Sequence, residues 1–191
     1  MSIRIISILS ALLFPALLMA QTLPVHIIAI VDGDTVKVKD KNGVKYIVSL
    51  SGVDAPEIQQ DYGTISKDEL CKLICDQEVV LSYNKLNTQG HVLSTVYLNG
   101  IDVNHEMLER GMAWQKMNDK DTTSRQHYNS YAKAENSARV KNVGLWKSSM
   151  NVSPWRWRQI NHQFGNSYLA HKKRPANCWP FLVYISRNYL F

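Results

Sequence analysis

The chain has 191 residues, 45% of them hydrophobic and 20% charged, with a formal net charge of +6. This length suits one globular domain with short extensions and excludes a small domain that depends on disulfide staples for its core. Residues 21–146 carry 14 basic and 16 acidic side chains, whereas residues 147–191 carry seven basic and no acidic ones. The slightly acidic main part excludes a protein that attracts polyanions through a broadly basic surface.

The amino terminus has the pattern of a signal peptide. Arg4 precedes an apolar run that ends at Ala20, before the polar Gln21. An uncleaved membrane anchor is the alternative, but the run is short and Pro15 interrupts it. We therefore expect residues 1–20 to be removed, a secreted or periplasmic location, and no stable membrane insertion after cleavage.

Five short strands are expected from period-two alternation of apolar side chains and from turn signals such as Asn42-Gly43. Five antiparallel strands with about three α-helices predict an α+β fold built on an OB-type five-stranded Greek-key β-barrel. The pattern alone does not separate such a barrel from a sandwich. The strands are expected at residues 25–31, 35–39, 46–50, 79–83 and 92–98.

Three helices are predicted between and after these strands. The first starts at Ser66, where Ser66 and Glu69 fit a capping box, and runs to about residue 75. The second covers residues 103–110 and stops at Gly111, and a longer one runs from Thr122 or Thr123 to about residue 141.

Three cysteines, an odd number, do not read as a disulfide framework. Cys71 and Cys75 are four residues apart on the first predicted helix, so they can share one face. No further sulfur or nitrogen ligands stand nearby, and we therefore expect free thiols rather than a metal site. Three histidines also lack partners at metal-binding spacing, namely His26, His105 and His127.

Acidic residues gather at the ends of two neighbouring predicted strands, in Asp32-Gly33-Asp34-Thr35 and Val53-Asp54-Ala55-Pro56-Glu57. Carboxylates from separate strands plus a loop carbonyl suit Ca²⁺, which tolerates irregular oxygen coordination. The alternative is structural: the first segment is a turn and Asp54 caps a loop.

These segments, with a distal Gly144-Leu145-Trp146, resemble the thermonuclease (staphylococcal-nuclease-like) family in type, order and spacing. The resemblance extends over residues 24–158, whose end, Pro154 to Arg158, looks like the family's frequent Pro-Trp-x-Trp-Arg. It implies a thermonuclease-like domain at residues 24–158, followed by a basic and then apolar tail of unknown role at residues 159–191.

The resemblance also implies a Ca²⁺-dependent phosphodiesterase that acts on DNA or RNA. Asp34, Asp54 and the carbonyl of Ala55 would bind Ca²⁺, Glu57 would activate water, and Asp32 would be a further acid beside the metal.

Two departures concern the arginines that grip the scissile phosphate in active members. Ser49 stands where the first is expected and cannot replace it, while His91 stands at the second and offers one contact when protonated. We therefore expect weakened binding of nucleic acid and weak or lost catalysis by a monomer. The alternative is a non-catalytic module that binds a polyanion or a protein. Three lysines are candidate replacements, namely Lys37, Lys45 and Lys85.

Overall fold

The structure, a computed structural model, describes residues 21–86, 91–116, 125–148 and 151–162. The predicted signal peptide, the turn at residues 87–90, both proposed helix caps, Thr122 and Thr123, and residues 163–191 lie outside the described residues. None of the described helices is long and apolar enough to span a membrane.

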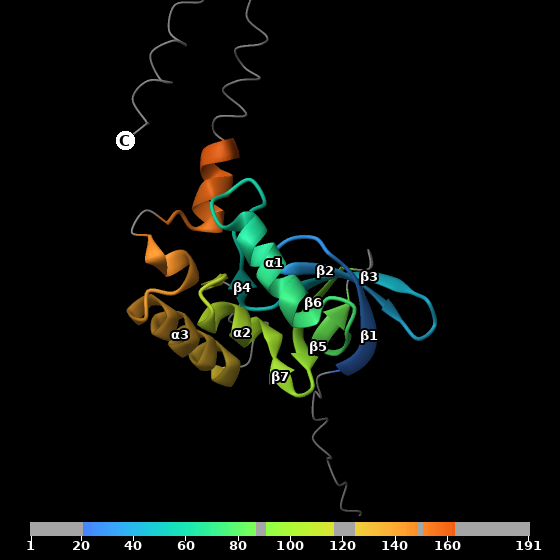
Figure 1. The fold of residues 1–191 in the computed structure, drawn as a ribbon. Coiled ribbons are helices and arrows are strands. Elements are labelled where there is room, and N and C mark those ends of the chain that lie inside the picture. The colour runs from blue at the N-terminus through green and yellow to red at the C-terminus, as the bar shows by residue number, and fades with distance from the viewer. Residues whose placement is uncertain (1–20, 87–90, 117–124, 149–150, 163–191) are drawn as a thin grey trace, which may run out of the picture.

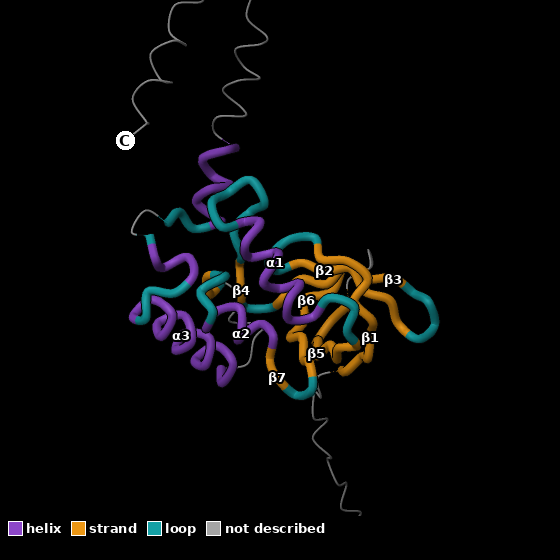
Figure 2. Tube along the Cα trace, in the orientation of Figure 1, coloured by secondary structure: helices purple, strands orange, loops and turns teal. Residues whose placement is uncertain are grey.

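The described chain forms a closed barrel of five strands, as the sequence predicts (Figures 1 and 2). Strands β1, β2 and β3 form an antiparallel meander, β5 returns to pair with β1, and β6 pairs with β5. A parallel pairing of β6 with β3 closes the barrel, and this seam decides for a barrel over a sandwich. The strands are β1 (Gln21–Ile30), β2 (Thr35–Asp40), β3 (Lys45–Leu50), β5 (Glu78–Leu86) and β6 (His91–Leu98).

Alternation explains the barrel's interior. Along β2 and β3 every second residue is buried, with Val36, Val38, Val48 and Leu50 at most 1% exposed. The residues between them face outwards, because successive side chains of a strand point to opposite faces. The Asn42-Gly43 turn is confirmed too, since Gly43 takes a φ of 84° between β2 and β3. Asn99 and Gly100 likewise take positive φ between β6 and the short β7 (Ile101–Asp102).

Helices cover one side of the barrel, where α2 (Val103–Glu109) and α3 (Arg125–Val140) pack against each other (Figure 1). The second helix ends as predicted, since Gly111 adopts a φ of +64°. Helix α1 (Gly63–Ile74) contacts β1 and α2, and a further helix covers residues 154–162. A short antiparallel pair joins β4 (Val53–Asp54) to β8 (Trp114–Gln115), and a 3₁₀ helix spans Gly144–Lys147.

The predicted capping box is wrong. Helix α1 begins at Gly63, after Tyr62 at a φ of 68°, so Ser66 lies within the first helical turn. Its buried hydroxyl donates to the backbone carbonyl of Met112 at 2.7 Å, and Glu69 pairs with Arg110 at 2.8 Å. Ser66 and Glu69 therefore have the residue types of a capping box, but their side chains bind segments that are distant in the sequence.

The expectation of free thiols at Cys71 and Cys75 is also wrong. Both sulfurs form a disulfide at the end of α1, where Cys75 is the C-terminal cap residue and leaves the helical conformation. The two Cα atoms lie 4.6 Å apart. Two of the three cysteines are therefore paired with each other, and Cys178 is the third. An odd number of cysteines did not exclude one disulfide.

Candidate metal and phosphate site

The turn between β1 and β2 presents the first two acids. The backbone N–H of Asp34 donates to Asp32 Oδ1 at 3.1 Å, and the carbonyl of Asp34 accepts from Leu50 N at 2.8 Å, which ties the turn to the end of β3. Gly33 lies against α1 so closely that a Cβ there would come within 2.0 Å of Ser66 Oγ. The glycine of the Asp-Gly-Asp motif therefore lets the turn pack on the helix.

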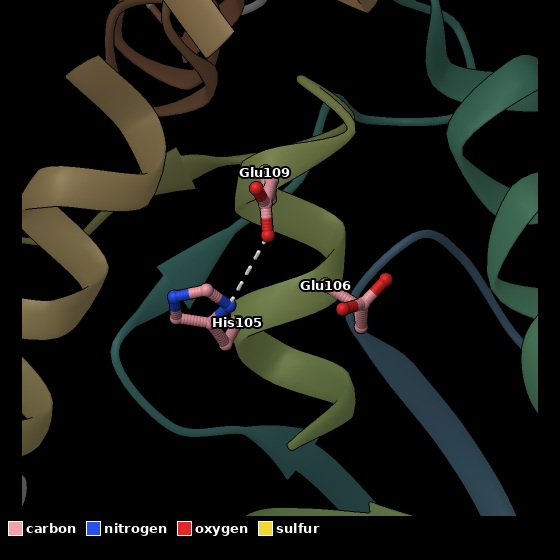
Figure 3. A group of neighbouring side chains, drawn as sticks. All are labelled: His105, Glu106 and Glu109. Atoms are coloured by element: carbon pink, nitrogen blue, oxygen red, sulfur yellow. Dashed lines mark ion pairs between the residues drawn. The ribbon is translucent and has the colours of Figure 1, made fainter. Parts of the chain in front are cut away.

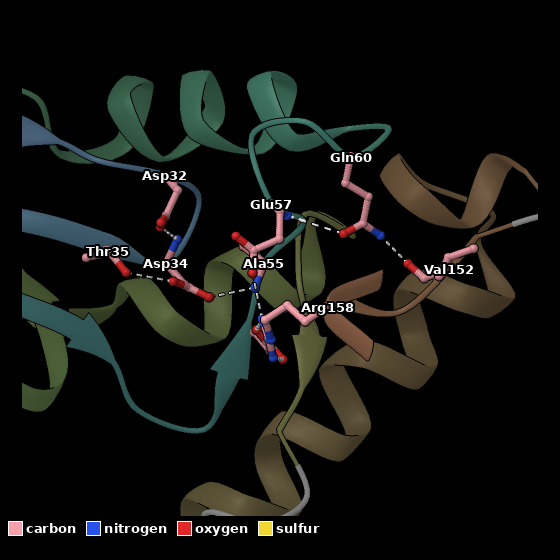
Figure 4. Close-up of polar contacts among 9 residues, drawn as sticks. Asp32, Asp34, Thr35, Ala55, Glu57, Gln60, Val152 and Arg158 are labelled. Atoms are coloured by element: carbon pink, nitrogen blue, oxygen red, sulfur yellow. Dashed lines mark hydrogen bonds and ion pairs between the residues drawn. The ribbon is translucent and has the colours of Figure 1, made fainter. Parts of the chain in front are cut away.

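The second acidic segment joins the same pocket. Strand β4 holds Asp54, and the backbone N–H of Ala55 donates to Asp34 Oδ2 at 2.7 Å, which links the two segments (Figure 4). The structure thus brings together Asp32, Asp34, Asp54, Ala55 and Glu57. The pocket is lined by Asp32, Asp34, Thr35, Ser49, Leu50, Val53, Asp54, Ala55, Pro56, Glu57, Leu93, Lys116 and Arg158.

Asp34 is short of neighbouring positive charge. Burial, and secondly the charge of Asp32, raise the pKa of Asp34 from 3.8 to about 7. Hydrogen bonds from the Ala55 N–H and from the Thr35 hydroxyl, at 2.9 Å, oppose this rise but do not cancel it. A bound cation would relieve this crowding of carboxylates.

Arg158 reaches this pocket from the helix at residues 154–162 (Figure 4). Its Nη2 donates to Asp54 Oδ2 at 2.8 Å and its Nη1 to Asp54 Oδ1 at 3.1 Å, a bidentate pair. Nη1 also donates to Glu57 Oε1 at 2.8 Å. These bonds, chiefly those that Asp54 accepts, raise the pKa of Arg158 above its usual value.

Gln60 connects the acidic loop to the segment that leads into this helix. Its Oε1 accepts from the backbone N–H of Glu57 at 3.3 Å, and its Nε2 donates to the carbonyl of Val152 (Figure 4). Gln60 and Pro154 are both buried. Glu57 and Arg158 are therefore positioned by one shared contact between chain segments.

Ser49 and His91 lie on one outward face of the barrel, at different distances from the pocket. Ser49 lines the pocket and is paired with Leu93 where β3 meets β6. His91 is paired with Ile47, two residues closer to the amino-terminal end of both strands. His91 is exposed and does not line the pocket. Two residues of a strand span about 7 Å, so a long side chain at position 91 would be needed to reach the pocket.

The candidate replacement lysines are placed differently. Lys37 is paired with Ile47 on the exposed face, and Lys45 is paired with Lys39 at the far end of β3; neither lines the pocket. The side chain of Lys85 lies outside the described residues. Lys116, on no predicted strand, does line the pocket.

The side chains that line the pocket carry oxygen donors of the kind that hard divalent cations prefer. Four carboxylates, from Asp32, Asp34, Asp54 and Glu57, line one pocket. Two positively charged side chains, Lys116 and Arg158, line it as well. Each carboxylate oxygen has two lone pairs, so the bonds from Arg158 still leave Asp54 able to coordinate a metal. Oxygen-only ligands of mixed spacing suit Ca²⁺, and Mg²⁺ demands stricter geometry.

Another acidic group lies on α2, where His105 has two glutamates close to it, in contrast to the expectation that it lacks partners at metal-binding spacing (Figure 3). His105 Nδ1 lies 3.8 Å from Glu109 Oε2, and ligand atoms of His105, Glu106 and Glu109 lie within 4.8 Å of one another. Arg110 already pairs with Glu106 at 3.2 Å, and Lys141 lies 4.0 Å from Glu109. The positive charges of Arg110 and Lys141 offset those of the two glutamates, so this cluster is explained as a set of ion pairs.

No role was predicted from the sequence for Arg158, Leu93 or Gln60. One signal was available, because Arg158 ends a Pro-Trp-x-Trp-Arg motif that resembles the family's frequent ending. Its partners are 101 and 104 residues away, so spacing could not have placed it at the acids.

Comparison with known proteins gives the family. A family model described as "Staphylococcal nuclease homologue" matches residues 47–148. An uncharacterized endonuclease of Escherichia coli is 33% identical over 137 residues, which cover 70% of this chain and 83% of that protein. An uncharacterized endonuclease of Haemophilus influenzae is 31% identical over 134 residues, 70% of this chain and 72% of that protein.

A plant relative is also similar. Staphylococcal-like nuclease CAN1 of Arabidopsis thaliana is 38% identical over 129 residues, 64% of this chain and 36% of that protein. The match thus spans about a third of the plant protein's length.

Proposed function

Since the chain belongs to the staphylococcal nuclease family, we propose that it hydrolyses phosphodiester bonds of nucleic acids with a Ca²⁺ ion held in the acidic pocket. The observation that carries this proposal is the convergence of Asp34, Asp54 and Glu57 on one pocket from separate segments. A structural turn and a loop cap would not need to bring their carboxylates together.

The residues have distinct roles in this proposal. Asp34, Asp54 and the Ala55 carbonyl would hold Ca²⁺, which polarises the phosphodiester and offsets its charge when bound. Glu57 takes the proton of the attacking water, because its side chain is 35% exposed and therefore within reach of solvent. Asp32 fixes the turn through Asp34 N and adds negative charge behind it.

Activity is expected to be weak relative to members with two gripping arginines. Ser49 lines the pocket but has no charge, and His91 is too short and too distant to replace a guanidinium. Loss of one charge-stabilising donor typically lowers a rate by about 100-fold to 1,000-fold. If cleavage proves absent while binding persists, a non-catalytic binding module becomes the better description.

The test is cleavage of single-stranded DNA by the purified monomer, with Ca²⁺ or with EDTA. We expect Ca²⁺-dependent cleavage that Glu57→Gln lowers by about 100-fold or more, since the amide cannot accept the proton. Glu78→Gln, a change at the start of β5 outside the pocket, is the matched control. Cleavage that ignores both Ca²⁺ and Glu57 would refute the proposal.

A secreted or periplasmic location is part of the proposal. The Cys71–Cys75 disulfide supports it, because structural disulfides persist in oxidising compartments. Mass spectrometry of the protein recovered from the producing cells and their medium would show whether the chain starts at Gln21.

A further inference from the structure

We infer that Arg158 binds a phosphate of the nucleic-acid strand, through the edge of its guanidinium that faces away from Asp54. The inference rests on the proposed function for the nature of its ligand. It assigns a substrate contact to a residue that follows the region matched by the family model, residues 47–148.

The first argument is the use of hydrogen-bond donors. A guanidinium has five N–H groups in one plane. Three of these N–H groups donate hydrogen bonds, two to Asp54 and one to Glu57. The remaining two, on Nε and Nη2, point from the same edge, and within the described chain no hydrogen bond uses them. Such a pair matches two oxygens of a phosphate.

The second argument is that the side chain is both accessible and held in place. Arg158 is 43% exposed, whereas Asp54, which anchors it, is 9% exposed. The bidentate bond and the Glu57 contact fix the plane of the guanidinium before any ligand arrives. A donor that is already oriented loses less conformational entropy on binding than a free arginine does.

The third argument is electrostatic. Carboxylates outnumber cations in this pocket, and a phosphate entering it meets repulsion unless a cation lies on its path. Among the described residues that line the pocket, Lys116 and Arg158 are the cations. Lysine is a point charge without a fork, so Arg158 is the better match for two phosphate oxygens.

A competing explanation is that Arg158 only neutralises Asp54 and Glu57. In that case the positive charge alone would matter, and Arg158→Lys, which keeps the charge, would bind phosphate as tightly as the native protein. A forked contact instead predicts weaker binding by Arg158→Lys than by the native protein, and native-like binding by this variant would overturn the inference.

The experiment measures binding of a fluorescein-labelled thymidine octamer with phosphorothioate linkages, which resist cleavage, by fluorescence anisotropy at one salt concentration. We expect Arg158→Gln to weaken binding by about 10-fold, in line with the loss of charge-assisted hydrogen bonds, and Arg158→Lys to weaken it less. Arg156→Gln is the control: it removes the same charge from an exposed position on the same helix and should change affinity by less than about 2-fold.

A second comparison guards against misfolding. Each variant is first checked by thermal unfolding, and Ser49→Arg is added to Arg158→Gln to place a guanidinium on the same pocket from the barrel wall. Recovery of affinity in the double variant is the expected result. Equal or tighter binding by folded Arg158→Gln, or an equal loss in Arg156→Gln, would overturn the inference.

Failure of the proposed function is distinguishable. Binding that depends on Arg158, without cleavage by the native protein, would refute the nuclease proposal and leave the phosphate contact standing. Cleavage by the native protein, with binding that does not depend on Arg158, would refute the phosphate contact and leave the nuclease proposal standing.

Discussion

Replacing Asp34 by asparagine should stabilise the metal-free protein at pH 8. Burial and Asp32 raise the pKa of Asp34 from 3.8 to about 7. Ionised Asp34 therefore lowers the free energy of unfolding by up to about 4 kcal/mol, since a tenfold change in proton affinity is about 1.4 kcal/mol. Asparagine can keep both neighbours, accepting from Ala55 N–H and donating to a rotated Thr35 hydroxyl. Allowing for imperfect bonds, we expect a net gain of about 1–3 kcal/mol.

The sign follows from proton binding. Between pH about 4 and 7 the folded protein keeps a proton on Asp34 that the unfolded chain has lost, so stability falls as pH rises through this window. Below about pH 4 both states are protonated and the penalty vanishes. Asp34→Asn should therefore differ little from the native protein at pH 4 and most at pH 8.

Urea unfolding in EDTA at these two pH values measures the difference directly. Asp68→Asn, at an exposed position of α1, is the control for loss of one negative charge. The reasoning is refuted if Asp34→Asn is no more stable than the native protein at pH 8, or if its advantage is the same at pH 4.

Three further outcomes are expected. Ca²⁺ at about 100 times its dissociation constant should raise the free energy of unfolding by about 2.7 kcal/mol, and Asp34→Ala should abolish that rise; an unchanged melting temperature without binding heat would contradict the metal site. Ser49→Arg with His91→Arg should raise Ca²⁺-dependent cleavage of single-stranded DNA by about 100-fold or more, and each single change less; a folded, Ca²⁺-binding but inactive double variant would count against a damaged nuclease. Cys71→Ser with Cys75→Ser should lower the free energy of unfolding in urea by about 2 kcal/mol, an expectation that fails if this variant matches the oxidised protein.

The barrel was predictable because its signals are local. Alternation along β2 and β3 identifies both strands, and Asn42-Gly43 marks the turn between them. Asp34 and Asp54 stand at strand ends that the barrel brings together, but spacing alone was equally compatible with a turn and a loop cap, and the family resemblance supplied the metal-binding hypothesis.

Other features depend on contacts that the local sequence does not encode. Ser66 and Glu69 have the residue types of a capping box, but Ser66 is not at the start of the helix, which begins at Gly63. The Ser66 hydroxyl instead donates a hydrogen bond to the carbonyl of Met112. Arg158 reaches Asp54 only through tertiary packing. The parallel pairing of β3 with β6 has no turn signal, so barrel and sandwich remained equivalent in the sequence.

The seam between β3 and β6 has a kinetic consequence. The paired residues Ser49 and Leu93 are far apart in the chain, and contacts of long sequence separation slow folding because loop closure precedes any gain from the contact. Both residues line the pocket, so its walls assemble only when the seam closes. We therefore expect the β1–β2–β3 meander to acquire protection from hydrogen exchange during refolding before the pocket can bind a ligand.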